Sequence, residues 1–70
     1  MASYSLEWED MVWVLRRHER KERIRAFRNK EDAFRWAEQL AWSEQDALVL
    51  TIGNPGNRPP DVYRFEGGRK

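Results

Sequence analysis

One stretch in the middle of the chain decides the fold, namely Asn29-Lys-Glu-Asp-Ala-Phe-Arg-Trp-Ala-Glu-Gln-Leu-Ala41. At about 100° per residue its apolar side chains share one face, which predicts an amphipathic helix. Asn29 suits an N-cap, and Asp32 stands three residues later, in the position of a capping box. The helical pattern ends near residues 43–45. The expected apolar stripe consists of Ala33, Phe34, Ala37, Leu40 and Ala41, with Trp36 at its edge.

Apolar or alternating segments on both sides of this helix predict β-strands, because they are rich in β-branched and aromatic residues. These segments are residues 11–17, 22–28, 47–52 and 61–66. A polar turn joins the first two, and a loop rich in proline and glycine joins the last two. The expected fold class is therefore α+β, with a ββαββ order and an antiparallel sheet that packs one helix on one face. The length of 70 residues suits a single domain over residues 1–70.

The two ends of the chain are less regular than its middle. Tyr4, Leu6 and Trp8 alternate, so residues 1–9 are expected as a short edge strand or as a tail packed on the domain. Residues 67–70 are expected as a flexible basic tail because they follow the last strand and contain two glycines.

A helix over residues 5–17 is an alternative to the strands expected there. Trp8, Met11, Val12 and Leu15 are spaced i, i+3, i+4 and i+7, as on one face of a helix. However, the run Val12-Trp13-Val14 is poor helix material because β-branched and aromatic side chains lose rotamer freedom in helices. Strand is therefore favoured for this segment.

Little in the sequence suits catalysis or the binding of a cofactor. The chain has no cysteine, and its one histidine, His18, lies in a polar turn without a neighbouring nucleophile. Carboxylates such as Glu31 and Asp32 match no ordered metal-binding loop, and no phosphate-loop or dinucleotide motif is present. We therefore expect no catalytic residue, no metal ligand, no cofactor and no enzymatic activity.

Two features predict a cytoplasmic location. The absence of cysteine gives no indication of a disulfide-stabilised secreted domain. The first ten residues are acidic, and the longest apolar run, residues 11–15, is far shorter than the ~20 residues that a membrane span requires. No membrane partner is expected.

The net charge of +1 conceals a strong segregation of charges along the chain. Residues 1–10 carry three carboxylates, a net charge of −3, and residues 31–46 carry five carboxylates against one arginine, a net charge of −4. Residues 16–30 carry eight cations against two carboxylates, a net charge of +6. A basic β-hairpin therefore lies between two acidic segments, and its local field matters more than the net charge.

This basic hairpin and one exposed tryptophan are the predicted partner-binding residues. Arginine makes planar, bidentate contacts with phosphates and carboxylates, and tryptophan and arginine dominate interface hot spots. Trp42 is included because it lies opposite the apolar stripe of the predicted helix. The alternative is a solvated face that the acidic segments neutralise. The predicted site residues are Arg16, Arg17, Arg20, Lys21, Arg23, Arg25, Arg28 and Trp42.

The order of these motifs resembles two groups of small proteins. The residues that carry the resemblance are Trp13-Val-Leu-Arg16, Arg25-Ala-Phe27, the helical stretch 29–41 and Ala47-Leu-Val-Leu50. One group consists of uncharacterised bacterial ββαββ domains, and the other of small phage-encoded inhibitors, including anti-CRISPR proteins. Both resemblances imply a binding module that is not an enzyme.

The sequence therefore predicts a small interaction protein that binds a protein or nucleoprotein complex through the basic hairpin. A phage-type inhibitor would be one protein of this kind. Direct binding of DNA or RNA through the same arginines is the alternative, because a two-stranded ribbon can enter a major groove. Homodimerisation is a further expectation, because a small core gains stability when a second subunit covers it.

Overall fold

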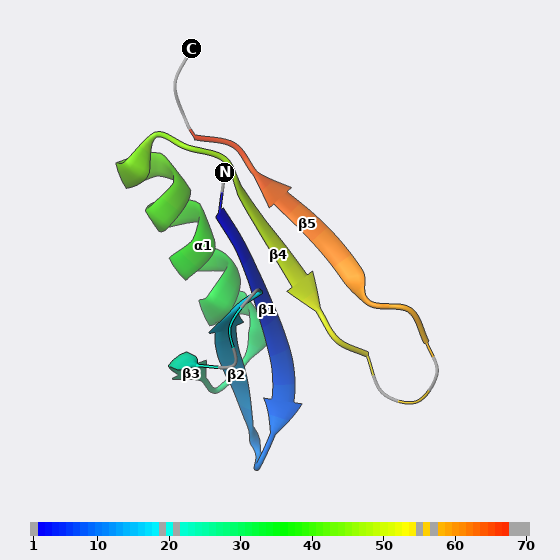
Figure 1. Ribbon diagram of the computed structural model, residues 1–70. Coiled ribbons are helices and arrows are strands. Elements are labelled where there is room, and N and C mark those ends of the chain that lie inside the picture. The colour runs from blue at the N-terminus through cyan, green and yellow to red at the C-terminus, as the bar shows by residue number, and fades with distance from the viewer. Residues whose placement is uncertain (1, 19, 21, 55, 57, 68–70) are drawn as a thin grey trace.

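The computed structural model describes residues 2–18, 20, 22–54, 56 and 58–67, in which five strands and one helix are formed (Figure 1). The strands form one sheet in the order β3-β2-β1-β4-β5, and the helix lies against one face of it. The elements are β1 (Ala2–Glu9), β2 (Val12–Arg17), β3 (Arg23–Phe27), α1 (Lys30–Glu44), β4 (Leu48–Ile52) and β5 (Asp61–Phe65). The α+β class with one helix is confirmed.

The N-terminal segment is the central strand of the sheet, and this corrects three expectations. β1 pairs antiparallel with β2 and parallel with β4, so the sheet is mixed and the order is βββαββ, not ββαββ with an antiparallel sheet. β1 is neither an edge strand nor a tail. The favoured strand interpretation of residues 5–17 is confirmed, apart from a turn at residues 10–11. The parallel partner, β4, lies far from β1 in the sequence, and no local sequence pattern predicts such a pairing.

A tight turn that the sequence does not announce joins β1 to β2. Its two central residues, Asp10 and Met11, have positive φ values of 50° and 71°, as a type I′ turn requires. Glu9 and Val12 are cross-strand partners on either side of it. Such turns usually contain glycine, as in Asn-Gly or Asp-Gly, and the pair Asp-Met lacks it. The sequence therefore does not indicate the turn and predicts a strand at Met11 instead.

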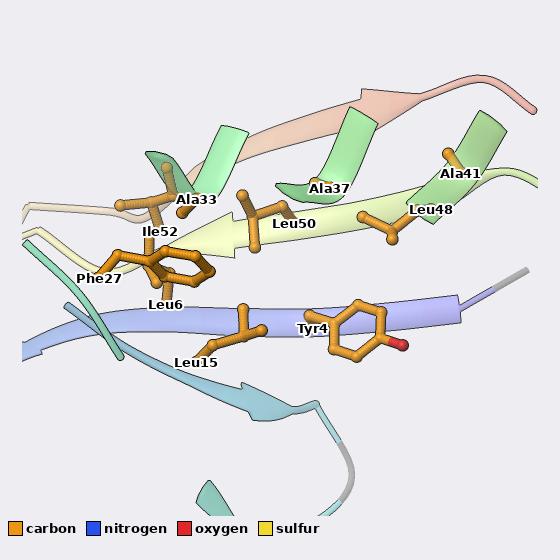
Figure 2. Close-up of a cluster of buried hydrophobic side chains, with 10 residues drawn as sticks. All are labelled: Tyr4, Leu6, Leu15, Phe27, Ala33, Ala37, Ala41, Leu48, Leu50 and Ile52. Carbon is orange, nitrogen blue, oxygen red and sulfur yellow. The ribbon is translucent and has the colours of Figure 1, made fainter. Parts of the chain in front are cut away.

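The core lies between α1 and the strands and is aliphatic at its centre (Figure 2). Ala33, Ala37 and Ala41 lie on one line of the helix and are buried, which confirms the predicted stripe. Larger rings lie around this centre, with the Tyr4 and Trp36 rings 5.2 Å apart and the Phe34 and Tyr63 rings 4.8 Å apart. The fully buried large side chains are Leu6, Leu15, Leu48, Leu50 and Ile52.

Both ends of α1 are capped by residues next to it in sequence. The Asn29 side chain accepts a 3.1 Å hydrogen bond from the backbone N–H of Asp32, which confirms the predicted N-cap. At the other end Gln45 adopts a left-handed conformation, and its N–H is directed at helix carbonyls. The chain that follows β5 lies against this cap, because a Cβ on Gly67 would be 2.7 Å from the Asp46 nitrogen. Gly67 therefore packs against the C-terminal cap of α1, and the rest of the tail expected over residues 67–70 lies outside the described residues.

The central position of β1 predicts a large effect of a cavity on that strand. We expect Leu6→Ala to lower the free energy of unfolding by about 2–5 kcal/mol, because Leu6 is fully buried. Ser3→Ala, on the same strand at an exposed position, is the control and should change stability by less than about 0.5 kcal/mol. Urea unfolding followed by circular dichroism measures both, and equal effects would contradict a central β1.

Candidate functional site

The structure spreads the hairpin arginines over several surfaces instead of one face. The register of β2 and β3 shifts after Leu15, so Arg25 lies opposite Leu15 while Arg23 lies opposite Arg16. Ile24 is the extra residue of this β-bulge. Strict alternation would have placed Arg23 and Arg25 on the same face, and the bulge turns them to opposite faces. The sequence contains no signal for the bulge.

Arg16 lies on the sheet face away from α1 and forms a bidentate ion pair with Glu9. Its two terminal nitrogens are 2.7 and 3.2 Å from the two carboxylate oxygens of Glu9. Glu9 pairs across the strands with Val12, and Arg16 pairs with Ser5. The Glu7–Val14 pair lies between these two pairs, so the side chains of Glu9 and Arg16 meet over Val14. Val14 is only 2% exposed although α1 covers the other face. The acidic N-terminal segment therefore does fold onto part of the basic hairpin.

This ion pair shifts the acid–base equilibria of both partners. The hydrogen bond from Arg16 lowers the pKa of Glu9 below its ordinary value of 4.5, and the charges of Arg16 and Arg23 act in the same direction. The same hydrogen bond raises the pKa of Arg16. Arg23 thus acts on Glu9 across the open face, in agreement with its position opposite Arg16.

The other hairpin cations are engaged locally or lie at the tip. The Arg17 guanidinium is 5.8 Å from the Tyr4 ring centroid, and that of Arg25 is 5.4 Å from the Phe27 ring centroid. Such contacts contribute about 0.5–1 kcal/mol each at exposed sites. Arg20 is exposed and 3.8 Å from Glu22. Lys21, another predicted site residue, lies outside the described residues.

Arg28 belongs to a different surface, an open cleft at the N-terminal end of α1. The cleft has a volume of about 970 Å³ and lies at the end of the sheet that contains the β1–β2 turn (Figure 1). The side-chain amide of Asn54 donates a 2.8 Å hydrogen bond to the Pro59 carbonyl oxygen, which fixes the β4–β5 loop that forms one wall. We call this surface the tryptophan cleft and define it by Trp8, Trp13, Arg28, Lys30, Asn54 and Arg58.

Two tryptophans on adjacent strands give the cleft its aromatic wall. Trp8 and Trp13 are cross-strand partners, and their ring centroids are 5.3 Å apart in an edge-to-face arrangement. Trp13 packs against the core, and the Lys30 ammonium lies 5.5 Å from its ring centroid. Trp8 is 51% exposed, so a large part of its ring is available to a partner.

Met11 is a second exposed apolar residue, in the turn that joins the two strands of this wall. It is 79% exposed at the tip of the β1–β2 turn, three residues from Trp8 in the chain. Its φ of 71° lies in the left-handed region, where a residue other than glycine costs roughly 1–2 kcal/mol. Backbone strain of this kind is concentrated at functional sites, because surrounding structure has to hold it in place.

The cleft carries charges of both signs. Arg28, Lys30 and Arg58 line it, and neither Arg28 nor Arg58 has an ion-pair partner among the residues that the structure describes. Three carboxylates, those of Glu7, Glu31 and Asp61, also line it. The N-terminal end of α1 adds a partial positive charge.

Of the predicted site residues that the structure describes, only Arg28 lies in the tryptophan cleft. Trp42 is 65% exposed near the C-terminal end of α1, whereas the cleft lies at the N-terminal end. Sequence reasoning missed Trp8 and Trp13 as site residues, because their cross-strand register depends on the unrecognised turn at Asp10 and Met11. Their spacing of five residues around an acidic residue at the turn was the only available signal.

Comparisons with protein-family models, curated proteins and solved structures find no match to this chain. The resemblance to small ββαββ domains and phage inhibitors therefore remains an expectation from the sequence. Within the described part of the chain, no group of three or more histidine, cysteine, aspartate or glutamate residues is placed to hold a metal ion. None of the described helical structure is long and apolar enough to cross a membrane.

The lowered pKa of Glu9 predicts a pH-dependent contribution to stability. Because the folded state favours ionised Glu9, the contribution is complete above the unfolded pKa near 4.5 and is lost as the pH falls through the lower folded pKa. Glu9→Gln should be less stable than the natural protein at pH 7, and this difference should shrink below pH ~4. Urea unfolding at a series of pH values measures it, and a constant difference would contradict the ion pair.

The left-handed conformation of Met11 predicts that glycine stabilises the turn. We expect Met11→Gly to raise the free energy of unfolding by about 0.5–1 kcal/mol, because glycine adopts positive φ without steric cost. Val12→Gly is the matched control and should destabilise, because Val12 lies in β2 and glycine weakens a strand. A loss of stability in Met11→Gly would contradict the strained turn.

Proposed function

We propose that this chain is a non-catalytic interaction protein that binds another protein through the tryptophan cleft. The observation that carries the proposal is that half-exposed Trp8 and the cation Arg28 line one cleft, at the end of the sheet where the turn carries exposed Met11. Tryptophan, methionine and arginine are enriched at protein interfaces, and tryptophan and arginine dominate their hot spots. The strain at Met11 supports a selected role for this turn.

The charges of the cleft favour a protein partner over a nucleic acid. A phosphate backbone approaching Arg28 and Arg58 would also meet the carboxylates Glu7, Glu31 and Asp61. A protein surface carries both signs of charge and can match such a pattern. A nucleoprotein complex, as bound by the phage inhibitors that the sequence resembles, would then be engaged through its protein component.

The dispersal of the arginines also weighs against the alternative of direct nucleic-acid binding through the hairpin. Arg16 is occupied by Glu9, Arg17 lies against Tyr4, and Arg20 is near Glu22. One continuous basic face would be needed for several simultaneous phosphate contacts. The structure instead turns neighbouring arginines to opposite faces of the sheet.

Substitution of the two most exposed tryptophans tests the proposal. We expect Trp8→Ser to reduce capture of the partner from lysate by about tenfold or more, because removal of a hot-spot side chain costs at least about 2 kcal/mol. Trp42→Ser is the matched control, since Trp42 is similarly exposed but lies at the other end of α1. Affinity capture with quantitative mass spectrometry measures both.

The opposite pattern, with capture lost in Trp42→Ser and kept in Trp8→Ser, would overturn the cleft and favour the helix surface. Circular dichroism melting confirms that both variants remain folded. Met11→Gly gives a second readout, because it should stabilise the protein while it weakens capture through loss of the exposed side chain.

A further inference from the structure

The outer edge of the sheet at β3 is a second surface, separate from the tryptophan cleft. β3 is the terminal strand of the sheet and pairs on one side only, with β2. Four of its five residues are exposed, including the small residue Ala26. Such exposure shows that no described segment covers this edge, so its backbone groups are open to a further strand.

The bulge at Ile24 gives this edge one arginine on each face of the sheet. Arg23 lies on the open face, opposite Arg16, and Arg25 lies on the face that α1 covers, opposite Leu15. Side chains of an added strand alternate between the same two faces. Cross-strand neighbours lie about 5 Å apart, so an added strand would place its side chains within reach of both guanidinium groups.

The charge of the edge selects the chemistry of that strand. Strand β3 carries Arg23 and Arg25 and no carboxylate, a net charge of +2. A second copy of β3 would oppose like charges, which destabilises strand pairing, so self-association through this edge is disfavoured. Arg16 and Arg23 are already like charges directly opposite each other, and Glu9 offsets their repulsion.

We propose that β3 receives an extended segment of a protein partner that carries an acidic side chain on each face, as an added strand of the sheet. Backbone hydrogen bonds would supply affinity, and the alternate carboxylates, meeting Arg23 and Arg25, would supply specificity. An added strand would pair with the open backbone edge of β3 and also contact the arginine on each face of the sheet. A phosphate backbone would contact the arginines but could not pair with the edge as a strand.

A synthetic peptide tests this proposal directly. The probe is a capped peptide of about eight residues with two adjacent central glutamates between alternating valine and threonine, so that the glutamates point to opposite faces. Titration into isotope-labelled protein should shift the amide signals of residues 23–27. The double variant Arg23→Glu/Arg25→Glu should bind the probe about tenfold or more weakly, because two exposed ion pairs become repulsive.

Three controls separate strand addition from simple charge attraction. The double variant should bind a peptide with lysines in place of the glutamates, and the natural protein should not. A glutamate probe with N-methylated central amides keeps its charges but cannot pair as a strand, so it should bind at least about tenfold more weakly. Arg20→Glu, at the tip beyond β3, should leave binding within about twofold because that residue is exposed and near Glu22.

Each opposite result overturns the proposal. Equal binding of the N-methylated probe would reduce the edge to a charged patch, and shifts centred on Trp8 and Trp13 would move the acidic segment to the cleft. Tighter binding of single-stranded DNA of equal charge at residues 23–27 would make the edge a nucleic-acid surface. None of these outcomes bears on capture through the cleft, because residues 23–27 are not part of it.

Discussion

Helix α1 lies close to the sheet because Ala33, Ala37 and Ala41 place only methyl groups between the helix backbone and the strands. The bulky rings are therefore displaced to the margins, where Phe34 meets the side chains of β5 and Trp36 meets Tyr4. These rings pack around the cluster of buried side chains that Figure 2 shows. The same close approach sets the N-terminal end of the helix beside the two tryptophans of β1 and β2, which is how a packing constraint produces the cleft.

The segregation of charge in the sequence has two different meanings in the folded protein. Some of the opposite charges pair within the protein, because Glu9 and Arg16 form an ion pair. This pair covers Val14, which is buried on the face of the sheet that α1 does not cover. The rest remains at the β3 edge, where Arg25 rests on an aromatic ring and has no carboxylate partner among the described residues. The face on which a surface arginine lies therefore depends on the strand register, since the bulge turns Arg23 and Arg25, which are two residues apart, to opposite faces.

The sequence predicts well whatever depends on neighbouring residues. The helix, its Asn29 cap and its alanine stripe follow from a period of 3.6, and the four expected strands follow from short apolar runs. The central place of β1 does not follow, because its partner in β4 is chosen by tertiary packing and leaves no mark near Tyr4 or Leu6. The bulge at Ile24 and the turn at Met11 are not predicted from the sequence either, because neither contains a glycine that would indicate it. The cleft depends on β1 and on the turn at Met11, so among the residues that line it Arg28 alone was predicted as a site residue.

The parallel pairing of β1 with β4 has a consequence for the order in which the protein is made. Ala2 and Leu48 are partners although they are 46 positions apart in the sequence, so β1 waits for a distant strand to complete its pairing. On the ribosome, β1, β2 and β3 can form a meander early, but the second edge of β1 and its buried face stay open until α1 and β4 have emerged. During that interval the growing chain exposes Leu6 and Leu15 beside an unpaired strand edge, the combination most prone to aggregation. Among the strands described, the middle strand is thus made before the others, but it gains its second partner only after α1 and β4 are made.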